Sequence, residues 1–293
     1  MIRHVKILQG HEGAIYKLQF DNSNRKLYSV GGDGWLVEWD PDHSSDGQLI
    51  ARVPDQLFSL AITPHRFYLG SFQGNFYILD RNSGAILHEQ RVHQRGIFSI
   101  LVHEHHVLTL GGDGRIVAWD ETSMQQVREY PLSGKALRVQ ALNPAGDVLA
   151  VGASDGSIYI LSFPELYLQK QIESAHVPSV FALTWADNRL ISGGRDALLK
   201  AWRHEMNYEL ELSLNAHWYA IYEVIATQEF LITASRDKTM RWWNRHTMEP
   251  VKTIQWGEVM EAHVHSVNTL AVDESRNMLF SGSEDRTIRI WQF

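Results

Sequence analysis

The sequence predicts an all-β fold built from repeated strand–turn–strand units, and three observations support this prediction. The stretch from Leu27 to Asp40 (LYSVGGDGWLVEWD) contains two alternating apolar runs joined by a Gly-Gly-Asp-Gly turn, a pattern typical of a β-hairpin. An aspartate marks this turn again and again along the chain, and in five copies a tryptophan follows six residues later. A recurring unit of this kind indicates a repeat architecture.

Alignment on the turn residue gives seven copies at steps of 40 to 48 residues. The turn positions are Asp33, Gln73, Asp113, Asp155, Asp196, Asp237 and Asp285. Five copies add a histidine 20 to 22 residues before the turn and a Ser or Thr four residues before it. Their four marker residues are His11, Ser29, Asp33 and Trp39; His93, Thr109, Asp113 and Trp119; His176, Ser192, Asp196 and Trp202; His217, Thr233, Asp237 and Trp243; and His263, Ser281, Asp285 and Trp291.

On these motifs the chain resembles the WD40-repeat family, and the resemblance covers nearly its whole length. It implies a seven-bladed β-propeller in which each blade is a twisted, four-stranded antiparallel sheet around a central channel. We therefore expect residues 1–293 to form a single WD40-type propeller domain with no linker left over.

The ring is expected to close through its two ends. Residues 4–8 alternate like a strand that has no earlier partner, and residues 288–291 finish the third strand of the last copy. Pairing these segments would remove the exposed edges of an open array. The N-terminal strand is therefore predicted to complete the last blade.

Two copies depart from the pattern. Copy two has Val53, Leu69, Gln73 and Leu79 at the four marker positions. Copy four keeps Asp155 but has Ser133, Val151 and Leu161 at the others. Because a buried polar network is favourable only when every member is satisfied, we expect its members to be kept or replaced together.

Histidine, serine and aspartate are also the residue types of a nucleophilic triad. An enzyme needs one such site rather than five, however, and no turn supplies a G-x-S-x-G nucleophile elbow. The family resemblance implies a structural relay instead, in which Asp accepts a hydrogen bond from His, His contacts Ser or Thr, and the hydroxyl meets the Trp N–H. We therefore predict that the chain is not an enzyme and needs no cofactor.

Composition narrows the class of protein. The net charge of −7 argues against a general nucleic-acid-binding surface, which needs a basic face. No apolar run reaches the roughly 18 residues of a membrane span, and Met1 to His4 does not open a signal peptide. Zero cysteines exclude disulfides and thiolate chemistry. We expect a cytoplasmic protein, monomeric on its own, with no nucleic-acid or membrane partner.

A binding surface should come from positions that vary between copies but share one place in space. Five residues after the aligned histidine position stand Tyr16, Phe58, Phe98, Arg138, Phe181, Tyr222 and Asn268. In the family this position faces the upper opening of the channel and often contacts partners. Tyr, Phe and Arg suit a protein or peptide anchor. The alternative is that these rings only pack at a narrow channel mouth.

Arginines stand directly before the turn aspartate in two neighbouring copies, at Arg195 and Arg236. Together with Arg138 they could receive an acidic or phosphorylated segment. The alternative is that these three side chains are simply solvated. The leading prediction is thus a non-catalytic scaffold that binds a protein or peptide at the channel mouth, and the alternative is a small-molecule-binding or enzymatic propeller with its site in the channel.

Three smaller features complete the sequence predictions. His103, His105 and His106 lie in one short predicted turn, which favours at most adventitious metal binding. The Gly-rich turns join two strands, so they lack the following helix of a phosphate cradle. The longest step between copies places a protruding loop at Ile254–Glu261, and insertions in repeat proteins often map to a binding face.

Overall fold

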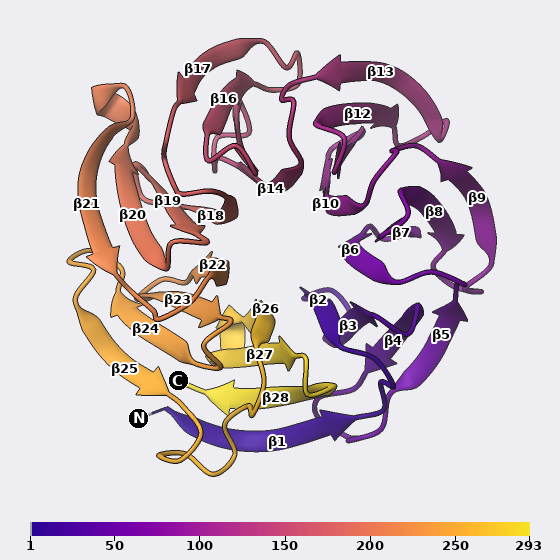
Figure 1. Cartoon of the computed structure of the whole chain (residues 1–293). Coiled ribbons are helices and arrows are strands. Elements are labelled where there is room, and N and C mark those ends of the chain that lie inside the picture. The colour runs from indigo at the N-terminus through magenta and orange to yellow at the C-terminus, as the bar shows by residue number, and fades with distance from the viewer. Residues whose placement is uncertain (1) are drawn as a thin grey trace.

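The computed structural model describes residues 2–293, which form seven four-stranded antiparallel sheets arranged in a ring (Figure 1). The predicted all-β propeller is confirmed. Within the described residues the only helices are two single 3-10 turns, η1 (His204–Met206) and η2 (Glu274–Arg276).

Each blade follows chain order from the channel outward, apart from the last. Blade one contains β2 (Ile15–Asp21), β3 (Lys26–Gly31), β4 (Trp35–Trp39) and β5 (Gln48–Arg52). Blade two contains β6 (Leu57–Ile62), β7 (Arg66–Ser71), β8 (Asn75–Asp80) and β9 (Ile86–Arg91). Blade three contains β10 (Ile97–His103), β11 (His106–Gly111), β12 (Arg115–Asp120) and β13 (Gln125–Pro131). Blade four contains β14 (Leu137–Leu142), β15 (Val148–Ala153), β16 (Ile158–Ser162) and β17 (Leu168–Ile172).

The remaining blades repeat this order. Blade five contains β18 (Val180–Ala186), β19 (Arg189–Gly194), β20 (Leu198–Arg203) and β21 (Glu209–Asn215). Blade six contains β22 (Ile221–Ala226), β23 (Phe230–Ser235), β24 (Met240–Asn244) and β25 (Pro250–Ile254). Blade seven contains β26 (Val267–Asp273), β27 (Met278–Ser283), β28 (Thr287–Gln292) and, as its outer strand, β1 (Arg3–Gln9).

The predicted closure through the N-terminal strand is confirmed. β1 runs antiparallel to β28, with Arg3 opposite Gln292 and Leu8 opposite Ile288. Leu8 is fully buried, whereas Val5 of the same strand is half exposed. The strand therefore contributes both a hydrogen-bond ladder and an apolar contact to the last blade.

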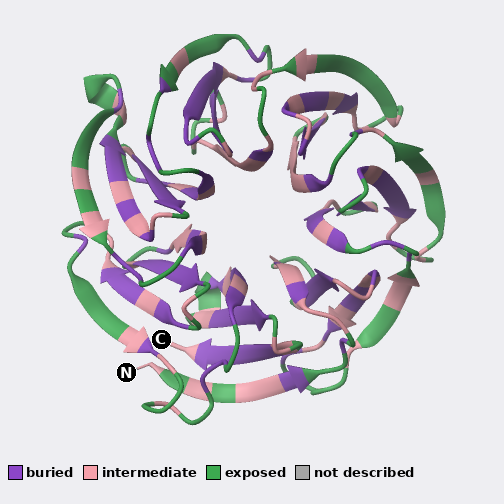
Figure 2. Ribbon diagram, in the orientation of Figure 1, coloured by how far each residue is buried: buried purple, intermediate pink, exposed green. Residues whose placement is uncertain are grey.

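The core of the ring lies between blades rather than inside them. Seven hydrophobic clusters are present in the described chain, and each draws its residues from two neighbouring blades. One example joins Trp291 of blade seven to Trp242 of blade six. The second strands are almost wholly buried, while the outer strands β9, β13 and β21 face solvent (Figure 2). Apolar burial thus holds adjacent sheets face to face.

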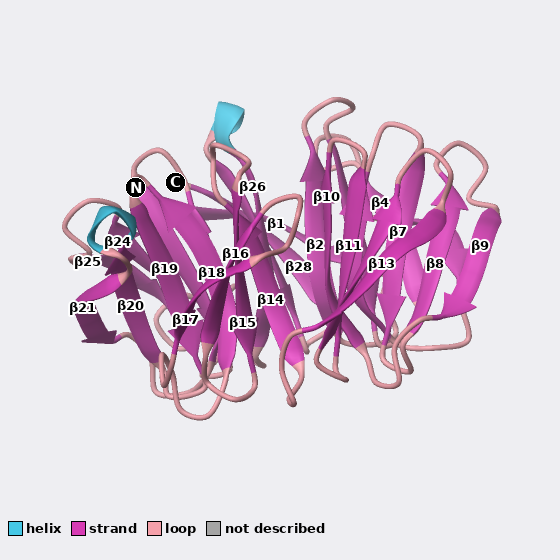
Figure 3. Cartoon of the chain, turned by 90° about the horizontal axis from the view of Figure 1, so that it is seen from above, coloured by secondary structure: helices cyan, strands magenta, loops and turns pink. Residues whose placement is uncertain are grey.

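The ring has two distinct faces, seen edge-on in Figure 3. One face, here called the histidine face, carries the turns with Asp33 and its equivalents and the loops with His11 and its equivalents. The opposite face carries η1 and η2. On that face Arg81 of blade two binds Asp21 of blade one, and Arg276 of blade seven binds Asp42 of blade one. Ion pairs therefore join neighbouring blades along the opposite face.

The insertion before blade seven begins slightly later than the sequence predicts. Ile254 ends β25 and is buried, so the irregular loop covers residues 255–266. Trp256 and Met260 project from it with 60% and 77% of their surface exposed, while Val259 packs on the cluster between blades six and seven. The loop is thus anchored on one side and exposed on the other.

Candidate protein-binding surface

Marker residues of the same copy meet on the histidine face. In blade one, His11 Nδ1 lies 2.7 Å from Asp33 Oδ2, His11 Nε2 lies 2.7 Å from Ser29 Oγ, and Trp39 Nε1 donates to Ser29 Oγ at 2.8 Å. Blades five, six and seven repeat the three contacts with distances between 2.7 and 3.1 Å. Each carboxylate also accepts the backbone N–H of the residue after the histidine, as in Trp218 N to Asp237.

Blade three lacks the last contact of this relay. His93 Nδ1 lies 2.9 Å from Asp113 and its Nε2 lies 3.0 Å from Thr109 Oγ1. The indole N–H of Trp119, however, is buried without a partner in the described chain. The relay expected from the family resemblance is therefore incomplete at Trp119.

The electrostatics of these groups fix their protonation states. Burial is the largest influence on the pKa of Asp237 and Asp285 and would raise it, but the interactions with the facing histidine, with Thr239 or Thr287 and with a backbone N–H together outweigh it and hold both pKa values below the usual range. Burial lowers the pKa of His217 and His263 more than the facing carboxylates raise it. Asp237 and Asp285 are therefore ionised, and His217 and His263 are neutral, with each Nδ1–H donating to the carboxylate and each Nε2 accepting from the hydroxyl.

Acidification from about pH 7.5 to about pH 5.5 is expected to lower the melting temperature. Unfolding returns His217 and His263 to a pKa near 6.5, so the unfolded chain binds more protons below that pH. The contribution of the two neutral histidines to the free energy of unfolding is complete above pH 6.5. It is lost as the pH falls toward their lowered pKa values in the folded chain. Thermal melts of the wild type and of His217→Gln/His263→Gln test it, because the variant should show a flatter slope. A melting temperature that rises on acidification contradicts the assignment.

The two atypical blades use other side chains in place of the relay. In blade two the carboxylate comes from the preceding loop, where Asp55 accepts the backbone N–H groups of Gln73 and Gln56 at 3.0 and 2.8 Å. In blade four Asp155 accepts the hydroxyls of Ser133 and Tyr159 at 2.6 and 2.7 Å. Asp55 was not among the predicted site residues, although a carboxylate two residues after the aligned histidine position is a readable signal.

The seven predicted channel-mouth positions are all half-buried and come together around the opening. The rings of Tyr16 and Phe58 stack with centroids 4.3 Å apart, and Phe58 meets Phe98 edge-on at 5.9 Å. On the other side Phe181 meets Tyr222 at 5.9 Å. We call these residues, with Arg138, the collar: Tyr16, Phe58, Phe98, Arg138, Phe181 and Tyr222.

Arg138 joins the two aromatic groups of the collar. Its guanidinium carbon lies 4.2 Å from the ring centre of Phe98 and 5.8 Å from that of Phe181. Its Nε donates to Ser154 Oγ at 2.8 Å. Burial lowers the pKa of Arg138, and the nearby charge of Arg195 lowers it further. A half-buried cation between two aromatic faces is a strong attractor for an anion once water leaves the site.

The other predicted binding residues lie around this collar. Asn268 turns toward blade one and donates from Nδ2 to the carbonyl of Ile15 at 3.0 Å. Arg195 and Arg236 are exposed, and Arg236 lies 5.9 Å from the ring centre of Tyr219. Their charges lower the pKa of the Tyr222 hydroxyl, although burial outweighs them and raises it overall. The structure therefore brings both arginines into the electrostatic environment of the collar.

The collar separates an outer hollow of about 250 Å³ from an inner channel hollow of about 120 Å³. In the inner hollow Lys17 of blade one donates to Glu223 of blade six at 2.5 Å, and the same carboxylate accepts the backbone N–H of Leu270 in blade seven at 3.1 Å. Glu223 thus joins three blades at the point of ring closure. Its carboxylate is engaged in holding the ring together.

Three segments of the chain match the WD40 family, described as WD domain, G-beta repeat: residues 2–40, 209–244 and 251–292. These segments are the closing strand with the first three strands of blade one, the outer strand of blade five with three strands of blade six, and the end of blade six with the first three strands of blade seven. These three segments are thus WD40 repeats, and the chain folds as a seven-bladed β-propeller.

Known proteins are similar to this WD40 propeller at low sequence identity. Kinesin-like protein KIF21A of Homo sapiens is 28% identical over 163 residues, which cover 53% of this chain and 9% of that protein. Transducin beta-like protein 3 of Rattus norvegicus is 22% identical over 325 residues, which cover 97% of this chain and 40% of that protein. The chain thus spans less than half the length of either relative.

A solved structure matches the chain over its full length. The WD40 beta propeller domain of Doa1 superposes with a TM-score of 0.86, covering 100% of this chain and 97% of that chain. Because the two sequences are only 16% identical, the likeness concerns the fold alone.

Other sequence-predicted features of the WD40 propeller lie away from the collar. The rings of His103 and His106 meet Phe163 edge-on at 5.6 and 5.5 Å. Over residues 2–293 no group of three His, Cys, Asp or Glu side chains is placed to hold a metal ion. No helix in the same range is long and apolar enough to cross a membrane.

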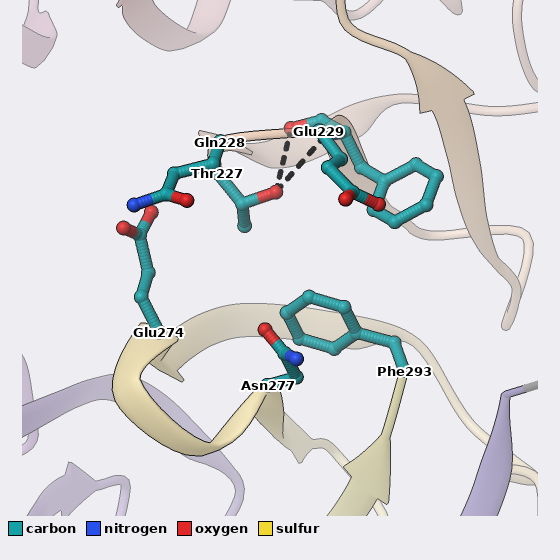
Figure 4. A pocket seen from close by; sticks show the side chains of 7 residues that line it. Thr227, Gln228, Glu229, Glu274, Asn277 and Phe293 are labelled. Atoms are coloured by element: carbon teal, nitrogen blue, oxygen red, sulfur yellow. Dashed lines mark hydrogen bonds between the residues drawn. The ribbon is translucent and has the colours of Figure 1, made fainter.

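A small hollow of about 80 Å³ lies on the opposite face between blades six and seven (Figure 4). Thr227 closes the turn of blade six by accepting the Phe230 N–H at 3.0 Å and donating to its carbonyl at 3.2 Å. Glu274 of η2 points toward Gln228 across the hollow, and Phe293 lies beside it. Its lining holds two carboxylates and no cation among the described residues, and we assign it no role.

Proposed function

We propose that this WD40 propeller is a non-catalytic scaffold that binds a segment of a protein partner at the channel mouth of its histidine face. The observation that carries the proposal is the collar, in which six contacting aromatic and arginine side chains surround an open hollow of about 250 Å³. A protein partner binds well to a rigid, partly apolar surface, because little conformational entropy of the surface is lost on binding. Tyr, Phe and Arg side chains provide such a surface.

The burial of the collar favours binding over simple packing. Every collar residue keeps part of its surface accessible to solvent. A water-filled channel mouth could be lined equally well by polar side chains, which would avoid exposing aromatic carbon to water. Contiguous aromatic surface that stays partly exposed is the property expected of an interface.

The chemistry of most acidic groups near the collar supports a role without turnover, the exception being the exposed Glu284 at the outer hollow. The relay aspartates are hydrogen-bonded to buried imidazoles, and Glu223 is held by Lys17 and a backbone N–H. A general base needs a carboxylate or imidazole that faces a substrate. The predictions that residues 1–293 act as a single domain, as a monomer, in the cytoplasm and without nucleic acid stay predictions that accompany this proposal.

Replacing the collar by alanine in Tyr16→Ala/Phe98→Ala/Tyr222→Ala is expected to abolish capture of a specific partner while the fold persists. The reason is the loss of three half-buried anchors, and interface anchors of this kind contribute about 2 kcal/mol or more each. Affinity capture followed by mass spectrometry measures the loss, and circular dichroism reports the fold. Tyr167→Ala is the matched control, because Tyr167 is an exposed tyrosine beyond β16 on the opposite face.

Unchanged capture by the triple variant would contradict the collar as the binding site and direct attention to the rim or the 255–266 loop. A catalytic alternative has its own signature. If a purified preparation shows a turnover that disappears in Arg138→Ala, the site is a channel enzyme rather than a scaffold.

A further inference from the structure

A second hollow, of about 550 Å³, lies beside the collar on the histidine face between blades two, three and four. Three phenylalanines and three arginines contribute to its walls: Phe58, Phe72 and Phe98, and Arg91, Arg95 and Arg138. In the described chain no aspartate or glutamate lines it. A locally positive surface in a chain of net charge −7 needs an explanation.

The three arginines are not neutralised by the protein. Arg91 donates to the carbonyl of Gln94 at 3.3 Å, and Arg95 is exposed. Within residues 2–293 neither of them, nor Arg138, forms an ion pair. Arg115, on the neighbouring β12, pairs with two carboxylates. The guanidinium groups of the hollow can therefore bind an external acid without breaking an internal ion pair.

Phe72 adds an apolar contact at the rim of the hollow. Its ring is 54% exposed and lies 5.5 Å from that of Phe58. In the other blades this turn position carries glycine, serine or a charged residue. Gly112 leaves space in the hollow that a side chain would fill. A Cβ at this position would come within 2.9 Å of the Cβ of Arg95 and 3.1 Å of the Phe98 ring.

The positive groups are spread along the hollow rather than gathered at one point. Arg91 ends β9, the outermost strand of blade two, whereas Arg138 lies on β14, the innermost strand of blade four. Arg95 lies in the loop that enters blade three. Several single charges along an extended segment match this arrangement better than one phosphate group, which requires converging donors.

We propose that this hollow binds an extended acidic segment of a protein partner, in which carboxylate side chains pair with Arg91, Arg95 and Arg138 and an apolar side chain packs on Phe72. The inference rests on the proposed function, because Phe58, Phe98 and Arg138 belong both to this hollow and to the collar. It adds the chemistry of the partner to the place where it binds.

Selection from a phage library of random peptides of about twelve residues tests the inference on the full chain. Selected sequences should be rich in Asp and Glu and carry an aromatic or aliphatic residue. Fluorescence anisotropy with one selected peptide should show an affinity loss of about tenfold or more for Arg91→Ala/Arg95→Ala, and a further loss at high salt. Arg203→Ala, an exposed arginine near η1 on the opposite face, is the matched control and should bind like wild type.

The outcomes separate this inference from the proposed function. Neutral or basic selected peptides whose binding depends on Tyr16 and Tyr222 but not on Arg91 and Arg95 overturn the inference and leave the scaffold proposal standing. Acidic peptides that depend on the arginines but not on the two tyrosines support the inference and move the binding site away from the collar. Failure to select any peptide counts against both.

A last experiment distinguishes carboxylate groups from a phosphate group as the ligand of the arginines. The selected peptide is resynthesised with phosphoserine in place of its acidic residues, one at a time. Affinity equal to or below that of the carboxylate peptide supports the proposal. An increase of about tenfold or more at one position assigns the arginines to a phosphate group and overturns the carboxylate version. Melting curves of Arg91→Ala/Arg95→Ala that match the wild type show that a loss of binding is not a loss of fold.

Discussion

Removal of residues 1–9 is expected to abolish the single cooperative unfolding transition of the propeller. The deletion takes away β1, which supplies the outer strand of blade seven and pairs with β28 along its length. It also removes the fully buried Leu8 from the cluster between blades seven and one. One buried leucine contributes about 2 kcal/mol, and each lost ladder bond about 1 kcal/mol. The sum approaches the whole stability of a domain, about 5–15 kcal/mol.

Thermal melts followed by near-ultraviolet circular dichroism measure this effect, and a pair of point variants refines it. Leu8→Asp puts an unpaired carboxylate into the buried side of β1, whereas Val5→Asp changes a half-exposed position of the same strand. We expect a large drop in melting temperature for Leu8→Asp and a small one for Val5→Asp. A truncated chain that melts like the full chain, with the same cooperativity, would refute closure by this strand as a source of stability.

Asp113→Ala is expected to lower the stability of the propeller by about 3–5 kcal/mol, the second-largest effect. Asp113 accepts hydrogen bonds from His93 Nδ1 and from the backbone N–H of Gln94, both at 2.9 Å, and pairs with Arg115 at 2.8 Å. His93 is buried, so the variant strands its N–H away from water. Each stranded buried partner costs about 1–3 kcal/mol. A urea titration measures the change.

Asp155→Ala is the matched control for Asp113→Ala. Asp155 occupies the same turn position in blade four, but its side-chain partners are the hydroxyls of Ser133 and Tyr159 rather than a buried imidazole. Because the hydroxyl of the partly exposed Ser133 can turn to water, and only that of the buried Tyr159 loses its partner, we expect a loss of only about 1–2 kcal/mol. A loss in Asp155→Ala as large as that in Asp113→Ala would show that the buried histidine is not what makes the relay costly to break.

The regular spacing of the repeats predicted most of the fold and most of the collar residues. Once seven copies are in register, residues at the same position within each copy share one place in space, and the family resemblance then put Tyr16 and Tyr222 at one opening of the channel. The closure by β1 followed from the same counting, because one end had a spare strand and the other lacked one.

Details that depend on side-chain direction and loop geometry could not be predicted from the spacing of the repeats. Among the described residues Trp119 leaves its N–H without a partner, although blade three keeps all four marker residues. The hollow around Phe72 needs the relative positions of three blades, which no spacing within one copy encodes. Side-chain direction and loop path decide such features, and both are set by tertiary packing.

The placement of every hydrophobic cluster at a seam between two blades limits how this protein can evolve. A blade taken out alone would leave two unmatched apolar surfaces, and the curvature of the remaining ring would no longer close. Gene duplication or loss of a single repeat is therefore a poor route to variation, whereas the turns and loops on either face can diversify freely. Natural relatives of this propeller should differ in the length and sequence of their loops much more than in the number of blades.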